Sequence, residues 1–217
     1  MEKKKILYRG GEGEISEKKS RFIATVRPVS CPEEAQEFIE EMKKKYWDAS
    51  HNCFAYSIGE NPPTERCSDD GEPQGTAGKP ILDVIRGEGL HDAAVVVTRY
   101  FGGTLLGTGG LVRAYSKAAQ EGISACEVIE KQSGKAVTLK AEYTDIGKVQ
   151  YLIGQRKLAV LESEYADSVI LKVLAPADDW ESFRDEITEG TAARTVFMEE
   201  KDVIFAWADG EPLIFGL

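Results

Sequence analysis

Several signatures of common function classes are missing from this chain of 217 residues. Its four cysteines include no C-x-x-C pair, which argues against a zinc ribbon or a dithiol redox motif. No apolar run approaches the length of about 20 residues that a membrane-spanning helix needs. Basic residues lie close behind the initial methionine, but no apolar stretch follows them, so we expect no secretion signal. These absences predict a soluble, cytoplasmic protein with reduced thiols.

Catalytic motifs are scarce as well. The sequence contains no nucleophile elbow, and its glycine spacing matches no standard P-loop. No residue is identifiable from the sequence as an obligatory general base. The sequence therefore favours a non-enzymatic role, and we expect no cofactor.

Basic residues are outnumbered by acidic ones, 27 to 37, which gives a net charge of −10. Such a charge argues against general attraction to nucleic acid, and we expect no recognition of DNA sequence. Residues 1–133 carry 18 basic and 21 acidic side chains, whereas residues 134–217 carry 9 and 16. No Asp or Glu occurs between Asp92 and Glu121, a window that holds Arg99, Arg113 and Lys117. This window predicts a local basic surface within an acidic protein.

The spacing of apolar residues predicts an α+β protein with two domains, 1–133 and 134–217. A Ser30-x-x-Glu33 capping box is typical of a helix start, and Ser133-Gly134 ends the last helical pattern of the first domain. The elements expected in the first domain are strand 21–29, helix 33–46, strand 52–58, loop 60–78, helix 80–86, strand 93–101 and helix 111–126.

The second domain shows the order strand, helix, two strands, helix, strand. The expected elements are strand 137–143, helix 145–153, hairpin 160–174, helix 180–187 and strand 193–198. This β-α-β-β-α-β order is that of a ferredoxin-like domain. Residues 203–207 and 213–215 remain, and we expect them to form an added strand or a packed tail.

Five glycines separate the predicted strand 93–101 from the body of the long helix. They are Gly102, Gly103, Gly107, Gly109 and Gly110. Glycine lets backbone N–H groups approach a ligand, and a helix N-terminus attracts anions. We predict that this segment binds phosphate groups together with Arg99, Arg113 and Lys117, and that Tyr100 or Phe101 stacks on an exposed base. The alternative is that the glycines serve tight turns and close packing.

Three acidic residues, Asp69, Asp70 and Glu72, occur within four positions and suit a hard cation such as magnesium. Asp-Gly and Glu-Pro are also turn dipeptides, so the alternative is a solvated loop without metal. We take that alternative and predict no metal site. Thr76 and Lys79, at the start of the next predicted helix, form a secondary anion-binding candidate.

His51 follows Asp48 and Ser50, an arrangement that invites a catalytic triad. Residues this close at the start of a strand point in different directions, so a structural or interfacial histidine is the preferred interpretation. His51 is also a secondary candidate for nucleic-acid or anion binding. Cys53 and Cys67 would complete a three-ligand metal set with His51, but the usual ligand spacing is absent.

Five segments carry a resemblance to a known family. They are Ser20–Ala24, Ala49–Cys53, Ser68–Gly78, Val97–Gly103 and Leu106–Arg113. Together they resemble the IMPACT family, in particular its bacterial YigZ-type members, over residues 1–133. The remainder is similar to the second domain of the bacterial proteins. The resemblance implies a first domain like one of the fifth small-subunit ribosomal protein, with helices on one face of its sheet, and a second like a ferredoxin-like domain of elongation factor G.

Residues and resemblance together favour a non-enzymatic translation regulator or accessory factor that binds RNA, the ribosome or a translation protein. A second hypothesis is an enzyme that holds a phosphorylated small molecule at the glycine-rich segment and magnesium at the acidic loop. A third is a protein-interaction module whose acidic second domain docks a basic partner. Eukaryotic relatives carry an additional module that binds a translational activator. Nothing in this chain resembles that module, so their role in restraining a translation kinase is not carried over.

Overall fold

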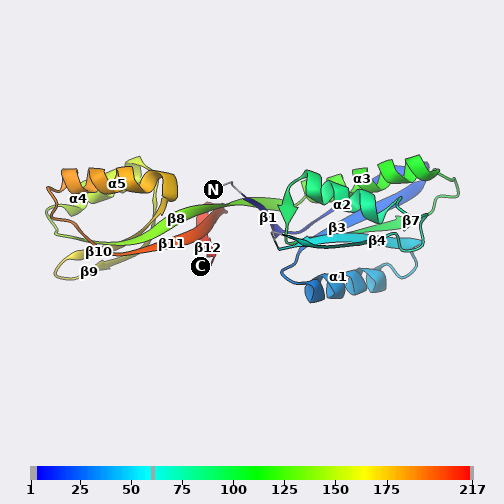
Figure 1. Cartoon of the computed structure of the whole chain (residues 1–217), viewed down its shortest axis with the longest axis horizontal. Coiled ribbons are helices and arrows are strands. Elements are labelled where there is room, and N and C mark those ends of the chain that lie inside the picture. The colour runs from blue at the N-terminus through cyan, green and yellow to red at the C-terminus, as the bar shows by residue number, and fades with distance from the viewer. Residues whose placement is uncertain (1–3, 60–61, 216–217) are drawn as a thin grey trace. The chain divides into compact units, whose positions relative to one another are not determined.

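The computed structural model describes residues 4–59 and 62–215, which form two compact α+β units (Figure 1). One unit comprises residues 4–129 and the other residues 130–215. The division falls within β8 (Glu127–Ala141), a continuous strand that also contains the expected boundary at residue 133. The α+β fold with two domains is therefore confirmed.

The first unit is built on a five-stranded antiparallel sheet with the order β2-β3-β7-β4-β5. The strands are β2 (Gly11–Glu17), β3 (Ser20–Pro28), β4 (His51–Ile58), β5 (Thr64–Ser68) and β7 (Ala93–Tyr100). The central strand β7 is the longest apolar run of the unit, and Ala93 to Arg99 are all buried. The expected loop 60–78 is wrong in part, because β5 lies within it. As a polar edge strand, β5 lacks the apolar pattern by which a strand is recognised.

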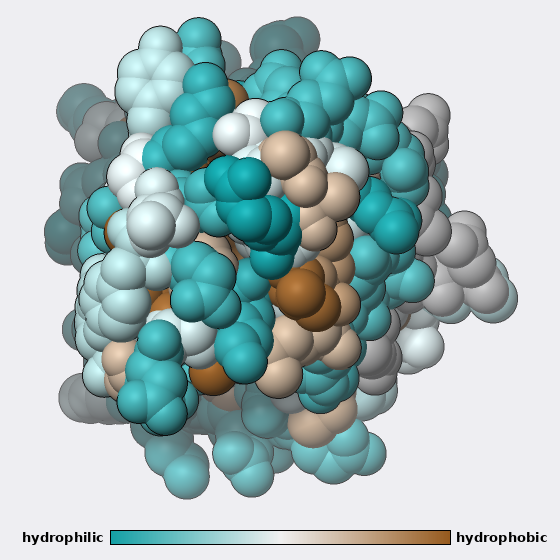
Figure 2. Space-filling view, turned by 90° about the vertical axis from the view of Figure 1, so that its left-hand side faces the viewer, coloured by the Kyte–Doolittle hydropathy of each residue, from teal (hydrophilic) through white to brown (hydrophobic). Residues whose placement is uncertain are grey.

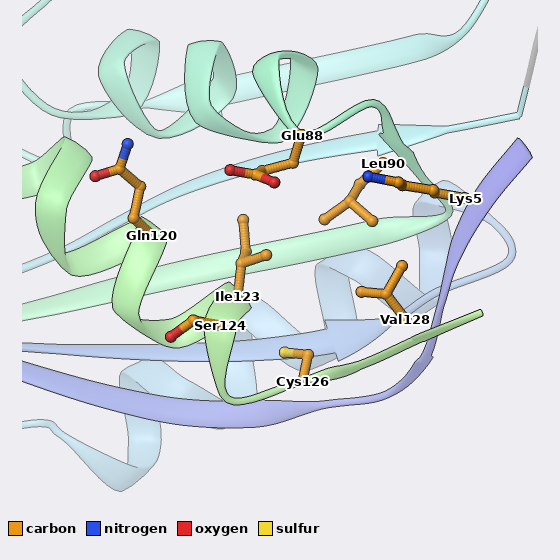
Figure 3. A pocket seen from close by; sticks show the side chains of 8 residues that line it. All are labelled: Lys5, Glu88, Leu90, Gln120, Ile123, Ser124, Cys126 and Val128. Atoms are coloured by element: carbon orange, nitrogen blue, oxygen red, sulfur yellow. The ribbon is translucent and has the colours of Figure 1, made fainter. Parts of the chain in front are cut away.

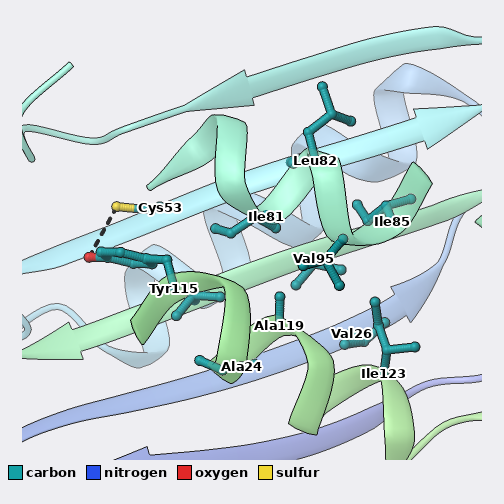
Figure 4. Close-up of a cluster of buried hydrophobic side chains, with 14 of the residues drawn as sticks. Ala24, Val26, Cys53, Ile81, Leu82, Ile85, Val95, Tyr115, Ala119 and Ile123 are labelled. Atoms are coloured by element: carbon teal, nitrogen blue, oxygen red, sulfur yellow. Dashed lines mark hydrogen bonds between the residues drawn. The ribbon is translucent and has the colours of Figure 1, made fainter. Parts of the chain in front are cut away.

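Helices cover both faces of this sheet, so the expectation of helices on one face is wrong. On one face α1 (Pro32–Lys45) packs Phe38 and Ile39 against Phe54 and Val96. On the other face α2 (Gly78–Gly87) and α3 (Thr108–Ser124) form a separate core with Val95 and Val97 (Figure 4). Successive side chains of a strand point to opposite faces of the sheet. Because the side chains of β7 are apolar on both faces, helices must pack against each face to bury them.

Two elements at the start of the chain are absent from the sequence-based prediction. β1 (Lys4–Arg9) pairs in parallel with the short β6 (Leu90–His91), and β2 forms a tight hairpin with β3. The hairpin turn is Lys18-Lys19, and both residues have positive φ, +45° and +68°. This turn conformation normally favours Asn-Gly, because side chains with a Cβ are strained there.

The second unit has the predicted β-α-β-β-α-β order. Its elements are β8, α4 (Ile146–Gln155), β9 (Ala159–Tyr165), β10 (Val169–Pro176), α5 (Ala177–Gly190) and β11 (Val196–Ala208). The sheet order β9-β10-β8-β11 is ferredoxin-like, and β12 (Glu211–Phe215) adds an edge strand beside β11. Trp180, Phe183 and Ile187 of α5 fill its core. The face of this unit seen in Figure 2 is mainly hydrophilic, with a band of hydrophobic residues to the right of its centre.

Within the ranges 4–59 and 62–215, no helix combines the length and apolar character needed to cross a membrane.

Candidate functional site

The glycine-rich segment connects β7 to α3 and lies between two pockets. Gly107 is the N-cap of α3 and has a φ of +71°, which glycine adopts without strain. The helix begins at Thr108, earlier than the predicted position 111. Leu106 lines both pockets, so this one segment forms part of each.

The larger pocket has a volume of about 480 Å³, and we call it the charged-floor pocket. Its buried members include the polar side chains of Glu72 and Arg99, and its apolar members include exposed Phe101 and Leu105. Arg99 is the last residue but one of β7, and Glu72 comes from the loop after β5. Antiparallel strands bring them together across the sheet, although they are 27 residues apart in the chain.

Arg99 and Glu72 form a buried ion pair in this floor. Arg99 Nη1 donates to Glu72 Oε1 at 2.5 Å, and the Tyr115 hydroxyl donates to the same oxygen at 2.8 Å. The side chains of Arg99 and Glu72 are only 6% and 4% exposed. Arg99 is therefore separated from Arg113 and Lys117, and the three cations do not form the single basic surface that the acid-free window predicts.

His51 also lines the charged-floor pocket, but it belongs to no catalytic triad. Its Nδ1 lies 2.9 Å from the carbonyl oxygen of Asp70, so Nδ1 carries the proton and donates it. Its Nε2 lies 3.9 Å from Glu72 Oε1. Ser50 and Asp48 are engaged elsewhere: Ser50 Oγ accepts from the Phe101 N–H, and Asp48 accepts from the Tyr100 hydroxyl at 2.8 Å.

The smaller pocket, of about 230 Å³, is lined by three exposed cations, and we call it the basic pocket. Lys18 comes from the β2–β3 turn, whereas Arg113 and Lys117 lie on one side of α3. Glu17 is the one acidic residue that lines this pocket. Sequence reasoning missed Lys18 because the hairpin was not predicted; the signal available was the charged Glu-Lys-Lys run before strand 21–29.

The glycines of the segment have different structural roles. Gly102 packs against the β2–β3 turn, since a Cβ at this position would overlap backbone atoms of Lys19 and Ser20. Gly103 has a φ of +80° with open space around it. Gly109 and Gly110 lie inside the first turn of α3. The turn-and-packing alternative therefore explains Gly102, Gly103 and Gly107 without a ligand.

The carboxylates of the acidic loop are used by the protein itself. Asp69 accepts from the backbone N–H groups of Gly75, Ala77 and Gly78 at 2.8–3.0 Å. The N-terminus of α2 is thus already occupied by an internal carboxylate. An external anion has no place there.

The neighbouring residues of this loop are engaged in the same way. Asp70 accepts from Lys43 and from the Asn52 N–H, and Glu72 accepts from Arg99. Of the other anion candidates, the Thr76 hydroxyl donates to the Pro73 carbonyl and Lys79 pairs with Asp83. Each of these side chains has its own partner, and they converge on no common point. The anion-binding candidate at the start of α2 is therefore corrected, because the N–H groups there already donate to Asp69.

We expect the contribution of this loop to folding stability to be lost in acid. Burial alone would raise the pKa of Asp69, but the N–H groups of Gly75, Gly78 and Ala77 outweigh it and hold the pKa below the ordinary 3.8. A lowered carboxyl pKa stabilises the fold above about pH 4, and the stabilisation is lost as pH falls through the folded-state pKa. We expect Asp69→Asn to lower the free energy of unfolding at pH 7 by about 1–2 kcal/mol. Denaturant melts from pH 7 to pH 3 measure this.

The control is Asp167→Asn, at an exposed hairpin turn, which should leave the melts unchanged. The Asp69 variant should also lose less stability than the wild type between pH 5 and pH 3. If the free energy of unfolding depended on pH in the same way in the wild type and in Asp69→Asn, the role given to Asp69 would be contradicted.

The cysteines do not form a metal site. Cys53 is fully buried in the core of Figure 4, where its sulfur lies 3.4 Å from the Tyr115 hydroxyl. Burial raises the pKa of the Cys53 thiol, so the thiolate that a metal requires is disfavoured. Cys67 is exposed on β5, away from this core. In the part of the chain that the structure describes, no group of three or more His, Cys, Asp or Glu residues is placed to hold a metal ion.

A third pocket lies at the other end of α3, and Figure 3 shows the side chains that line it. Lys5, Glu88 and Gln120 give it a polar rim around Leu90 and Ile123. Its remaining lining residues are Ser124, Cys126 and Val128. Burial raises the pKa of the Cys126 thiol to about 11, so this sulfur is mostly protonated and weakly nucleophilic at neutral pH.

Comparisons with known proteins give consistent matches over most of the chain. Residues 18–123 match the Impact N-terminal domain, and residues 139–194 match a domain of unknown function, DUF1949. IMPACT family member YvyE of Bacillus subtilis is 41% identical over 189 residues, which cover 87% of each chain. IMPACT family member YigZ of Escherichia coli is 38% identical and covers 74% of this chain and 79% of its own. A solved structure described as a hypothetical protein has a TM-score of 0.58 at 33% identity and covers 91% of this chain and 97% of its own.

Proposed function

This chain belongs to the IMPACT family, and on that basis we propose that it is a non-enzymatic, translation-associated factor that binds RNA at its basic pocket. The observation that carries the proposal is the convergence of Lys18, Arg113 and Lys117 from two separate elements on one pocket. Their exposed charges suit the phosphate backbone of RNA, which proteins contact chiefly through Lys and Arg.

The placement of Lys18 supports a functional reading of this pocket. Lys18 and Lys19 occupy a hairpin turn with positive φ, which costs about 1 kcal/mol per residue with a Cβ. Asn-Gly would form the same turn without that strain. Strained backbone is retained where the residue serves another purpose, and here it places a cation beside α3.

The helix dipole gives no argument for a functional role of Arg113 and Lys117. Because α3 begins at Thr108, these cations lie in its second and third turns, beyond the reach of most of the macrodipole. Their positions on the side of α3 facing the β2–β3 turn, and not the helix dipole, therefore support the proposal.

Exposed apolar side chains lie beside the glycine-rich segment that connects β7 to α3. Phe101 is 48% exposed, which leaves a ring face available for stacking on an unpaired base. Tyr100 is less available, since its hydroxyl is bound to Asp48. The enzyme alternative has less support, because Asp69, Asp70 and Glu72 are each bound to protein groups and do not face a common ligand.

RNA binding should depend on salt and on two residues of α3. We expect the wild-type chain to bind a single-stranded RNA at low salt, with log K falling against log salt at a slope of about −2 for three neutralised phosphates. Replacing Arg113 and Lys117 together by Gln should reduce the slope to about −1 and weaken binding at least about tenfold at low salt. Its melting temperature should stay close to that of the wild type, since both side chains are exposed.

The matched control is Lys44→Gln with Lys140→Gln, two exposed lysines away from the pocket that give the same change in net charge. It should bind RNA nearly as the wild type does. If neither RNA nor ribosomes bind at low salt, the proposal fails and a protein partner becomes the better hypothesis. If the Arg113/Lys117 variant binds with an unchanged slope, the RNA site lies elsewhere.

A further inference from the structure

His51 brings an unused hydrogen-bond acceptor to the charged-floor pocket. Its Nδ1 donates to the Asp70 carbonyl oxygen at 2.9 Å, so the neutral ring carries its free lone pair on Nε2. Nε2 accepts no hydrogen bond from the described residues. Unlike Arg99 Nε, it retains accessible surface, and the His51 side chain is 25% exposed. A ligand in this pocket can therefore donate an N–H group to Nε2.

Phe101 lies on the same face of the sheet as this acceptor. His51 of β4 is the direct partner of Arg99 on β7, and side chains two residues apart on a strand point to the same face. Phe101 follows the end of β7, and its ring centroid lies 5.5 Å from Arg99 Cζ. Phe101 is 48% exposed, so the pocket combines an accessible aromatic ring with a free acceptor.

The charges of the pocket floor favour a neutral ligand that carries a donor. The charges of Arg99 and Glu72 offset each other, and both side chains are nearly inaccessible. Glu72 Oε1 lies 3.9 Å from His51 Nε2, so a carboxylate oxygen stands beside the free acceptor. This carboxylate repels an anion at that place and attracts the positive end of an N–H group. Phosphate groups are therefore expected to stay outside this pocket.

The charged-floor pocket adjoins the basic pocket at the start of α3. Leu106 lines both pockets, and Gly107 and Thr108 line the charged-floor pocket. Arg113 Nη1 lies 3.9 Å from the position that a Cβ on Gly109 would take, so this cation reaches back to the first turn of α3. An RNA strand whose phosphates lie at the basic pocket has its neighbouring bases within reach of the charged-floor pocket.

The remaining lining suits a flat aromatic group. Leu105, Leu106 and Leu111 contribute to the volume of about 480 Å³, which lies in the range of small-molecule pockets. Every nucleobase has a face that stacks on an aromatic ring, and unpaired RNA bases are recognised by such stacking together with hydrogen bonds to their edges. An aliphatic side chain of a protein partner would fill the same space but has no donor for His51.

We propose that the charged-floor pocket receives one unpaired base of an RNA whose phosphates bind at the basic pocket. The base stacks on Phe101, and its amino group donates to His51 Nε2. The phosphates stay outside, beside Lys18, Arg113 and Lys117. This inference rests on the proposed RNA binding and adds to it the recognition of a single base.

Short oligoribonucleotides that carry a base only at their central position test this proposal. The central base is adenine, purine (which lacks the amino group) or absent, and the phosphates are the same in all three. The isotope-labelled full chain is titrated with each at low salt, and amide chemical shifts are followed. We expect the adenine oligonucleotide to bind about tenfold more tightly than the baseless one, because a stacked base contributes at least about this factor. The purine oligonucleotide should bind about threefold more weakly than the adenine one, because it lacks one hydrogen bond. Shifts that depend on the base should be confined to residues near Phe101, Gly107 and Thr108.

Two variants separate stacking from the hydrogen bond. Phe101→Ser removes the exposed ring and should reduce the advantage of adenine over no base to about twofold or less, while the baseless oligonucleotide binds as before. His51→Asn keeps an N–H group for the Asp70 carbonyl but lacks Nε2, so adenine and purine should bind equally well. The control Tyr151→Ser, at an exposed position of α4 in the other unit, should bind all three as the wild type does. If Phe101→Ser does not fold, the three oligonucleotides and His51→Asn still decide the question.

Failure of this inference and failure of the RNA proposal give different results. If no oligonucleotide binds at low salt, the RNA proposal fails and the base pocket fails with it. If all three bind equally well and the Arg113/Lys117 double variant weakens them, RNA binding stands and the base pocket is refuted. Free adenosine that binds as tightly as the adenine oligonucleotide would also overturn the inference, since the pocket would then take a nucleoside independently of the basic pocket. Equal binding of adenine and purine by the wild type would exclude the hydrogen bond to His51.

Discussion

Replacing Glu72 by Gln is expected to lower the free energy of unfolding by about 3–5 kcal/mol. The substitution keeps the shape and one acceptor but removes the negative charge beside Arg99. Both side chains are nearly inaccessible to solvent, so the Arg99 charge would be left buried without its counter-charge. Removing one member of a buried pair is strongly destabilising for this reason, even though the pair as a whole contributes little net stability.

Urea denaturation at pH 7 measures this effect, and two further variants interpret it. Asp83→Asn removes the partner of the exposed Lys79, and we expect little change in the melt because exposed ion pairs are screened by solvent. Combining Glu72→Gln with Arg99→Met removes both charges and should restore most of the lost stability. If the double variant is no more stable than Glu72→Gln alone, the uncompensated charge is not the cause.

The strongly periodic parts of the fold could be predicted from the sequence. α3 and the helices and strands of the ferredoxin-like unit repeat apolar residues at helical or alternating spacing, and the structure contains them. The start of α1 is a partial success: the N-cap is Cys31, and Glu34, not Glu33, accepts from the Ser30 N–H and hydroxyl. Local spacing thus located the helix but not the residues that cap it.

The short polar strands could not be predicted in this way. β5 and the β2–β3 hairpin are at or near the edge of the sheet and depend on pairing with distant strands. Their residues carry little apolar alternation, and the Lys-Lys turn contradicts the usual turn preferences. Without the hairpin, Lys18 cannot be placed beside Arg113.

The charged-floor pocket could not be predicted from the sequence either, for a related reason. Arg99 and Arg113 lie in one acid-free window of the sequence, but residues that share such a window need not share a surface. The partner of Arg99 is Glu72, from the loop after a strand that was not predicted. Long-range strand order, and not local pattern, determines which charges meet.

Gly102→Ala is expected to destabilise the first unit by about 3 kcal/mol and to displace the lysine turn. A Cβ at Gly102 would overlap the carbonyl group of Lys19 and the nitrogen of Ser20. These are backbone atoms in a hairpin, so no side chain can rotate away to make room. Either the turn shifts, which moves Lys18 away from Arg113 and Lys117, or the glycine-rich segment shifts away from the turn.

Gly109→Ala is the matched control from the same segment. An added Cβ there meets only Arg113 Nη1 at 3.9 Å, and the position lies in the first turn of α3. Alanine should therefore stabilise the helix by about 0.5–1 kcal/mol and leave RNA binding unchanged. Thermal melts and RNA titrations of both variants, at a temperature where each is folded, give the comparison. Loss of RNA binding in Gly102→Ala but not in Gly109→Ala would link binding to the position of the lysine turn, whereas a Gly102→Ala chain with wild-type stability would contradict the close packing on which that link depends.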